Sequence, residues 1–322
     1  MRTEHGTTGP ACGGGPGVSA PRTRGPEAER DASLSLLGER GLLPDQETAT
    51  GLVEISAVAE TPSQSGVGVI APYDFALDRE LWRWAPDDVS LYVTRLPFVP
   101  VPVTVDQASA LSDGDGAARA TRDLLAPEPL VVGYACASGS FVHGAEGQRR
   151  LQQAILDAGA PAAVTTSGAL IEALEAVGTR RIAVVTPYVD SVTERLVTYL
   201  GEHGTDVVNA VGLGLLDHIW KVSYAEVVEA VRGADRPEAE AVFISCTNVL
   251  TYDIIAPLER MLGKPVLAAN QVTMWAALKA VGRHPVGAGQ HLVEATAPAG
   301  ARAHGGRGGD EGDDTERRSA RA

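Results

Sequence analysis

The sequence predicts an α/β protein made of two similar halves, each containing a parallel sheet. From residue 66 onward, short apolar runs alternate with amphipathic stretches, the order typical of strands and helices in parallel sheets. Runs such as 182–185 and 242–244 are wholly apolar, as expected for strands buried on both faces. The halves also repeat a pair of segments, GVGVIAPYD with VVGYACASGS in the first and RIAVVTPYVD with AVFISCTN in the second.

Each apolar run is assigned to a strand and each amphipathic stretch to a helix. In the first half we expect strands at 66–71, 90–96, 130–135 and 163–166, and helices at 77–84, 104–125, 147–158 and 167–177. The second half repeats this order, with strands at 181–186, 206–211, 241–245 and 266–269, and helices at 189–203, 223–231, 254–262 and 271–281. Gly178 is expected to end the helix before it, because glycine adopts the left-handed conformation of a helix C-terminus.

The chain divides into a folded body and two polar ends. The ends are rich in Gly, Pro and charged residues and bury too little apolar surface to offset the entropy of ordering. We therefore expect a mostly disordered N-terminal extension at 1–60, with a short helix at 34–40, a linker at 61–65 and a disordered tail at 297–322. The first α/β half is expected to span 66–164 plus 270–292, and the second 165–269.

The composition excludes several classes of protein. The formal net charge is −14 and the pI is about 4.9, which disfavours a nucleic-acid partner, since such proteins need a basic face. No apolar run is long enough for a membrane span, and no secretory signal is visible. Three cysteines do not form a disulfide framework, so a cytoplasmic protein is expected. His143 and His218 lack a second ligand at a metal-binding spacing, so no metal is expected.

Cys136 and Cys246 are the candidate catalytic residues. Each directly follows a strand, and ligands of parallel sheets gather at the carboxyl ends of the strands. Backbone N–H groups in the turn after the strand would lower the pKa of the thiol and make it reactive. For either cysteine alone, a buried structural role is the alternative. Because the halves match, we expect two thiols to face one cleft, which suits proton transfer or covalent addition at carbon.

Polar residues around the same strand ends are candidate substrate contacts. Their hydroxyl, amide and backbone groups could bind a carboxylate, although such side chains also cap the following helix, the role expected for Asp74 and Asp190. Tyr188 could hydrogen-bond a carboxylate or a developing enolate, or pack with its hydroxyl in water. The candidate substrate-binding residues are Tyr188, Ser138, Gly139, Ser140, Thr247, Asn248, Tyr73, Asp74 and His218.

Three segments, YACASGS, VVTPYVD and ISCTNV, resemble the aspartate/glutamate racemase superfamily, and within it the maleate cis–trans isomerase and arylmalonate decarboxylase branch. The resemblance covers about residues 66–281. It implies two flavodoxin-like halves related by a pseudo-two-fold, a site between them, and neither a metal nor an organic cofactor. It further implies that Cys136 adds to the double bond of maleate, that Cys246 moves protons, and that Tyr188 holds a carboxylate. Such relatives often self-associate, so a homo-oligomer is among the expectations.

Two positions depart from the isomerases. The isomerases carry an asparagine a few residues after the first strand, whereas this chain has Tyr73-Asp74-Phe75 there. A second substrate-binding asparagine of the isomerases corresponds to a position at or near His218 and is also lost. An aspartate at the first position would repel a dicarboxylate and suit an ammonium group. Because decarboxylases of this branch keep only the second cysteine, the leading expectation is a cofactor-independent isomerase of a maleate-like acid. The alternatives are a racemase or decarboxylase of an amino acid or substituted malonate, including an ectoine-utilisation-type role, and a non-catalytic carboxylate-binding protein.

Overall fold

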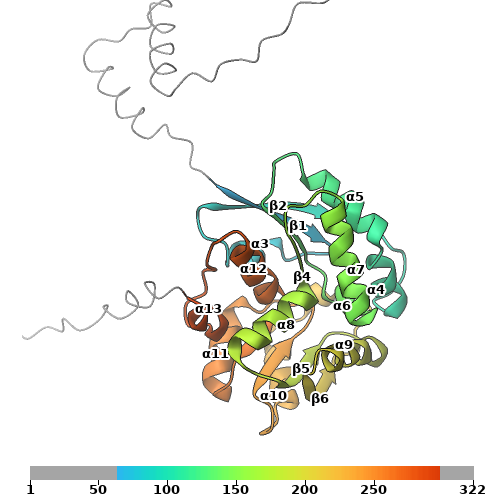
Figure 1. Ribbon diagram of the computed structural model, residues 1–322. Helices are drawn as coiled ribbons and strands as arrows, with labels where there is room; N and C mark the ends of the chain where they lie inside the picture. Colours follow the sequence, from blue (N-terminus) through green and yellow to red (C-terminus); the bar gives the residue numbers. More distant parts are fainter. Residues whose placement is uncertain (1–63, 298–322) are drawn as a thin grey trace, which may run out of the picture. The chain divides into compact units, whose positions relative to one another are not determined.

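The computed structural model describes residues 64–297 and shows two parallel sheets of four strands each (Figure 1). The first sheet has the order β2-β1-β3-β4 and the second the order β6-β5-β7-β8, so the two sheets share one topology. This confirms the predicted α/β fold with duplicated, flavodoxin-like halves. The strands are β1 (Ser65–Ala71), β2 (Val89–Arg95), β3 (Val131–Tyr134), β4 (Ala163–Thr165), β5 (Arg181–Thr186), β6 (Asp206–Gly212), β7 (Ala241–Ile244) and β8 (Val266–Ala268).

Helices connect the strands in the expected order. Before β5 they are α3 (Asp78–Trp82), α4 (Val105–Leu111), α5 (Gly114–Leu124), α6 (Ala137–Phe141), α7 (Gly144–Asp157) and α8 (Thr166–Val177). They continue as α9 (Asp190–Glu202), the 3₁₀ turn η1 (Ile219–Lys221), α10 (Tyr224–Ala234), α11 (Tyr252–Leu262), α12 (Ala269–Ala280) and α13 (His291–Ala295).

The differences from the sequence prediction concern helix ends and short helices. The helix expected at 104–125 is two helices, because the Asp113 side chain accepts hydrogen bonds from the N–H groups of Asp115 and Gly116 and starts α5 anew. The helices α6, η1 and α13 were not predicted. Gly178 ends α8 as predicted, with a φ of 72°.

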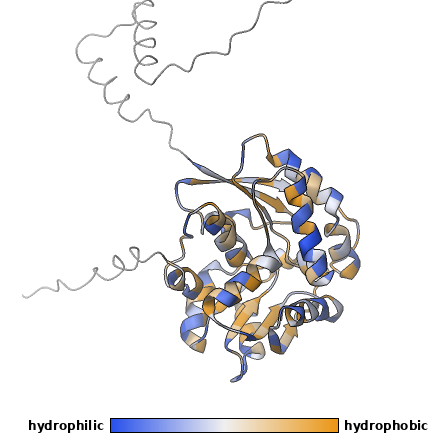
Figure 2. Ribbon diagram, viewed as in Figure 1, coloured by the Kyte–Doolittle hydropathy of each residue, from blue (hydrophilic) through white to orange (hydrophobic). Residues whose placement is uncertain are grey.

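The core lies between the sheets and the helices that cover them. Every residue of β1 is buried, as is every residue of β5 after Arg181, which matches the nearly continuous apolar sequence of these strands. Figure 2 shows hydrophobic residues along the strands and hydrophilic ones on the outer faces of helices such as α7. Among the described residues, no helix is both long and apolar enough to cross a membrane.

The two halves are joined through equivalent helices. α12 follows the last strand of the second sheet but packs on β3 and β4 of the first, and it lies against α8. At the start of this helix pair the hydroxyls of Thr166 and Thr273 are 2.8 Å apart. The exact division of the chain at residues 164 and 165 stays a prediction. The predicted extension at 1–60 lies outside the described residues, as do all but residues 64 and 65 of the predicted linker at 61–65 and all but residue 297 of the predicted tail at 297–322.

A buried carboxylate strengthens this junction. Glu80 in α3 is 4% exposed and accepts hydrogen bonds from the backbone N–H groups of Thr251 and Tyr252, the latter at 2.8 Å. These groups begin α11, where a negative charge is favoured by the helix dipole. The second oxygen of the carboxylate accepts from the Asn270 amide, which also donates to the carbonyl of Thr247 at 2.9 Å. Glu80 thus ties the first half to the turn that carries Cys246.

We expect Glu80→Ala to lower the free energy of unfolding by about 3 kcal/mol or more, because it leaves several buried donors without an acceptor. Urea denaturation followed by circular dichroism measures this change. The matched control is Asp78→Asn in the same helix, an exposed position where a change within about 0.5 kcal/mol is expected. If Glu80→Ala changes the free energy of unfolding as little as the control does, the hydrogen bonds of this carboxylate do not stabilise the protein.

Candidate active site

Both cysteines lie where the strand order of their sheet reverses. In the first sheet, β1 and β3 are neighbours; Pro72 to Asp74 follow β1, and Cys136 follows β3. In the second sheet, Tyr188 follows β5, and Cys246 follows its neighbour β7. Such switch points are where open parallel sheets bind ligands, because the loops after the two strands diverge there.

One small cavity is formed where these loops meet. Its volume is about 20 Å³, roughly the space of one water molecule. Both thiols therefore share a single small cavity, which is too small in this structure to hold a carboxylic acid. The lining residues are Pro72, Asp74, Val103, Gln107, Leu111, Cys136, Ala137, Ser138, Tyr188, Ile219, Cys246, Thr247 and Asn248.

Cys136 is enclosed by its own turn. Its side chain receives a hydrogen bond from the backbone N–H of Gly139, and its sulfur lies 3.9 Å from the hydroxyl oxygen of Ser138. Burial nevertheless raises the pKa of the thiol to about 11, because these donors and the Tyr134 hydroxyl offset only part of the lost hydration. The nearby carboxyl group of Asp74 raises this pKa further.

Cys246 has equivalent surroundings in the second half. The backbone N–H of Asn248 points at its sulfur at 3.4 Å, and the Tyr188 hydroxyl donates a second hydrogen bond. Burial raises the pKa of this thiol to about 12 despite both donors. The residue has a φ of 85°, a backbone conformation that is costly for a side chain with a Cβ and that clusters at functional sites.

The expectation of lowered thiol pKa values is therefore wrong. The predicted N–H donors are present at both cysteines, but the desolvation of a buried thiolate outweighs them. No Lys, Arg or His is among the residues that line the cavity, so no cation offsets the charge there. We therefore expect both cysteines to be protonated at neutral pH.

Five of the predicted substrate contacts also line the cavity: Tyr188, Ser138, Thr247, Asn248 and Asp74. Some of their side chains already form hydrogen bonds within the protein. The Thr247 hydroxyl donates to the carbonyl of Ala135 at 3.1 Å, and the Asn248 amide accepts from the N–H of Ala76 at 2.9 Å. These two side chains hold the halves together beside the thiols. Asp74 does not cap α3, since its own carboxylate bonds its own N–H, and Asp190 does not cap α9.

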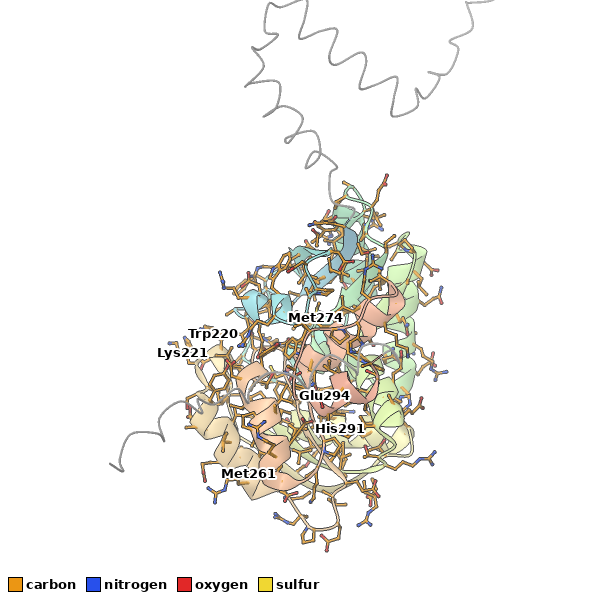
Figure 3. All side chains as sticks on the ribbon, turned by 90° about the vertical axis from the view of Figure 1, so that its left-hand side faces the viewer. Trp220, Lys221, Met261, Met274, His291 and Glu294 are labelled. Atoms are coloured by element: carbon orange, nitrogen blue, oxygen red, sulfur yellow. The ribbon has the colours of Figure 1, made fainter. Side chains whose placement is uncertain are left out.

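The remaining predicted contacts do not line the cavity. Tyr73 accepts a hydrogen bond from Gln107 at 2.7 Å, Ser140 donates to the carbonyl of Ala137 at 2.8 Å, and Gly139 lies behind Cys136. His218 is exposed and pairs with Asp217 at 3.0 Å. Its left-handed backbone directs the next residue, Ile219, into the cavity instead. Figure 3 shows the following residues of η1, Trp220 and Lys221, at the edge of the molecule.

Sequence analysis missed the apolar wall of the cavity, formed by Val103, Leu111 and Ile219, and the polar Gln107. Val103 and Ile219 come from different halves, and the N–H of Val103 donates to the carbonyl of Leu216 at 2.8 Å. No motif marks these residues, because their role arises only from the contact between two loops.

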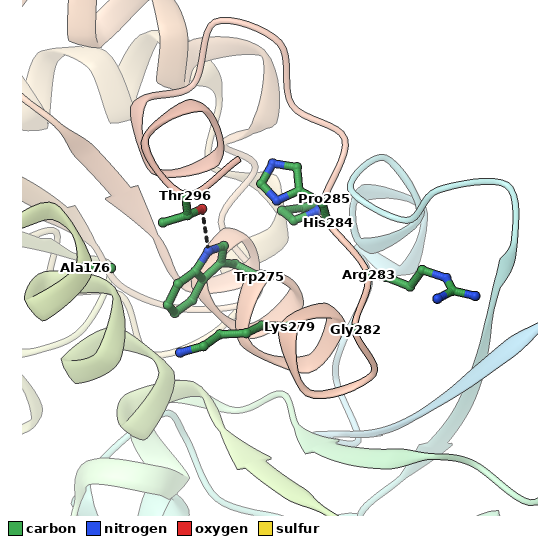
Figure 4. A pocket seen from close by; sticks show the side chains of 8 residues that line it. All are labelled: Ala176, Trp275, Lys279, Gly282, Arg283, His284, Pro285 and Thr296. Carbon is green, nitrogen blue, oxygen red and sulfur yellow. Dashed lines mark hydrogen bonds between the residues drawn. The ribbon is translucent and has the colours of Figure 1, made fainter. Parts of the chain in front are cut away.

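A larger hollow lies away from the thiols. Its volume is about 390 Å³, and it is lined by residues of α8, α12, the segment between α12 and α13, and Thr296 after α13 (Figure 4). The Trp275 indole donates to Thr296 at 3.0 Å, Lys279 pairs with Glu172, and Arg283 pairs with Asp88. This hollow holds no thiol or carboxylate, so the smaller cavity is the candidate active site.

Two duplicated parallel-sheet halves that enclose a pair of thiols at their switch points define an α/β enzyme of the aspartate/glutamate racemase type. The family model described as arylmalonate decarboxylase matches residues 115–293, more than half of the chain. The protein belongs to this family, in the branch that also contains the maleate isomerases.

Known relatives agree with this assignment. The maleate isomerase of Pseudomonas putida KT2440 is 36% identical over 172 residues, covering 50% of this chain and 69% of the relative. The arylmalonate decarboxylase of Bordetella bronchiseptica is 33% identical over 156 residues, covering 47% of this chain and 65% of the relative.

Solved structures extend the similarity to the whole folded body. A liganded double mutant of arylmalonate decarboxylase superposes with a TM-score of 0.64 at 27% identity, covering 72% of this chain and 99% of that one. The maleate isomerase Iso of Pseudomonas putida S16 gives a TM-score of 0.64 at 26% identity, with the same coverage of 72% and 99%.

Iodoacetamide should label Cys136 and Cys246 slowly at neutral pH and about tenfold faster for each pH unit between 7 and 10. The reason is that only about one thiol in ten thousand is ionised at pH 7 when its pKa is near 11. Mass spectrometry of a Cys12→Ser background measures both rates, with glutathione as the unperturbed thiol. Rates that level off below pH 8 would contradict the raised pKa values.

Gly139→Ala should lower kcat/KM for the protein's own substrate by about a hundredfold, because the new Cβ would lie 2.6 Å from the Tyr134 hydroxyl oxygen and 3.2 Å from the Cys136 sulfur. The matched control is Gly201→Ala in α9, where a Cβ meets nothing within 4 Å. Steady-state kinetics of the two variants, with folding checked by circular dichroism, make the comparison. Unchanged kinetics for Gly139→Ala would mean that the position of this sulfur is unimportant.

Proposed function

We propose that the protein is a cofactor-independent isomerase of a small, maleate-like carboxylic acid, with Cys136 and Cys246 as its catalytic pair. The observation that carries the proposal is that both thiols line one cavity at equivalent strand ends of the two halves. Reagents on opposite walls can act on the two carbons of one double bond. The relatives named for maleate and for arylmalonate support a small carboxylate as substrate.

The reaction begins when the thiol of Cys136 gives up its proton to water and becomes a thiolate, while Cys246 remains a thiol. The sulfur of Cys136 adds to one alkene carbon, the π bond breaks, and its electron pair moves into the adjacent carboxyl group as an enediolate. Cys246 protonates the other carbon and becomes a thiolate. After rotation about the new single bond, Cys246 takes the proton back and the C–S bond breaks. The trans double bond and the starting state of both cysteines are then restored.

The cavity favours charge only where the reaction needs it. The burial that raises the pKa of Tyr188 well above its ordinary value keeps this hydroxyl protonated, so that it can donate to a carboxylate or an enediolate. The Ser138 hydroxyl, beside Cys136, is a second donor in the lining. Each such donor in a water-poor site stabilises a developing oxyanion by about 3 kcal/mol.

Racemisation is the second candidate. A thiol from each half can serve as acid on one face of a carbon and as base on the other, through the same enediolate. The acidic side chain of Asp74 in the cavity favours this alternative, because it suits an amino acid better than a dicarboxylate. Decarboxylation of a substituted malonate would use Cys246 alone as the proton donor.

Proton NMR with maleate, substituted malonates and amino acids tests the proposal. We expect maleate or a close analogue to give its trans isomer, with Cys136→Ser and Cys246→Ser each at least a hundredfold slower and Cys12→Ser unchanged. Exchange of the α-hydrogen in deuterated water would instead indicate racemisation, and release of carbon dioxide that survives Cys136→Ser would indicate decarboxylation. Equal turnover by the wild type and both cysteine variants would sink the two-thiol mechanism, and binding without turnover would identify a carboxylate-binding protein.

A further inference from the structure

We propose that Tyr134 is a positioning residue for Cys136, and that its hydroxyl donates a hydrogen bond to the sulfur when Cys136 becomes a thiolate. The inference deepens the proposed function, on which its consequence for turnover rests. Tyr134 ends β3, two residues before Cys136, and its side chain is fully buried. It does not line the cavity, so it acts on a substrate only through the cysteine.

A glycine brings the hydroxyl and the sulfur together. Gly139 has no side chain, and a Cβ at this position would lie 2.6 Å from the hydroxyl oxygen of Tyr134 and 3.2 Å from the sulfur of Cys136. Both atoms therefore border the space that the missing Cβ leaves free. The backbone N–H of Gly139 donates to the same sulfur, and the two side chains interact as a hydrogen-bonding pair.

The hydroxyl of Tyr134 also has a second acceptor. It donates to the carbonyl of Leu111 at 2.5 Å, and the last carbonyls of a helix such as α4 have no N–H partner within the helix. A hydroxyl has one proton, and a thiolate is a stronger acceptor than a carbonyl. Rotation about the C–O bond therefore turns the proton from Leu111 to the sulfur when Cys136 ionises. Because the carbonyl then loses its donor, the net gain is smaller than that of a full charged hydrogen bond.

The second half meets the same need from a different position. Its counterpart of Tyr134 is Ile244, which ends β7 two residues before the cysteine. There the hydroxyl of Tyr188, from the loop after β5, donates to the sulfur instead. The counterpart of Tyr188 in the first half is Tyr73, whose hydroxyl pairs with Gln107. Each thiol thus has a tyrosine hydroxyl beside it, although the two tyrosines are not equivalent in the duplicated fold.

The surroundings of Cys136 offer the thiolate no cation. The other titratable groups that interact electrostatically with this sulfur are acidic or neutral: Asp74, Tyr73, Tyr188 and Cys246. Neutral donors must therefore stabilise the charge. Burial, with a smaller effect of Asp113, raises the pKa of Tyr134 well above its ordinary value, so the hydroxyl keeps the proton that it has to donate.

Alkylation of Cys136 between pH 7 and 10 tests the inference. We expect iodoacetamide to label Cys136 about threefold to tenfold more slowly in Tyr134→Phe than in the wild type, and to label Cys246 at the same rate within about twofold. Loss of the donor makes the thiolate about tenfold rarer, and the higher nucleophilicity of a less acidic thiol offsets part of this change. Mass spectrometry of the Cys12→Ser background separates the two sites.

Tyr199→Phe is the matched control, because it removes a buried tyrosine hydroxyl in α9 that is not among the groups acting on either thiol. It should change neither labelling rate. If the hydroxyl of Tyr134 serves only packing, its loss would leave the labelling of Cys136 unchanged or would speed it by loosening the turn. Either result would overturn the inference.

A second variant covers the case in which Tyr134→Phe does not fold. Incorporation of 3-fluorotyrosine at position 134 keeps the size of the side chain and makes its hydroxyl a stronger donor. We expect Cys136 to be labelled at least twofold faster in this variant. An unchanged or slower rate would contradict a hydrogen bond from this hydroxyl to the thiolate.

The role of Tyr134 and the two-thiol mechanism are separable, because alkylation needs no substrate. With an acid that the protein converts, Tyr134→Phe should lower kcat by about threefold to tenfold and change KM less than twofold. Slower labelling with unchanged kcat would support the hydrogen bond to the sulfur and overturn Cys136 as the nucleophile. Turnover that requires Cys136, together with wild-type labelling in Tyr134→Phe, would keep the mechanism and overturn the role of Tyr134.

Discussion

The site exists only because two switch points face each other across the junction between the halves. Neither half alone holds more than one thiol, and the thiols share a cavity because side chains next to them cross the junction. Thr247 reaches the carbonyl of Ala135, and Asn248 clamps the loop around Asp74. The residues expected to bind substrate are therefore partly the ones that keep the two halves in register, and catalysis and assembly depend on the same contacts.

The chemistry of the cavity follows from the burial of its ionisable groups. Burial raises the pKa values of both cysteines and of Tyr188, so the resting site carries little charge apart from Asp74. A carbanion next to a carboxylate gains most from fixed donors in such surroundings, because no water has to reorganise around the developing charge. The cost is that one thiol must lose its proton before covalent addition can begin, and burial makes that loss harder.

Sequence patterns were sufficient for the architecture and for part of the site. Every expected strand appears within one residue at each end, because apolar runs and strand ends are local properties of the chain. The same reasoning located Cys136 and Cys246 at a shared edge. It could not place Val103 or Ile219, whose loops meet through a contact between halves, nor the outward direction of His218, which depends on one left-handed residue. The pKa values were misjudged because local donors are visible in a sequence and solvent exclusion is not.

The exchange of helices also bears on how the chain acquires its structure. α12 covers strands of the first sheet but is encoded near the end of the folded body. A ribosome that has released only the first half has therefore not yet supplied one of the layers of that half. Its sheet would keep an apolar face uncovered until almost the whole polypeptide has emerged, a period in which assistance from chaperones would matter most.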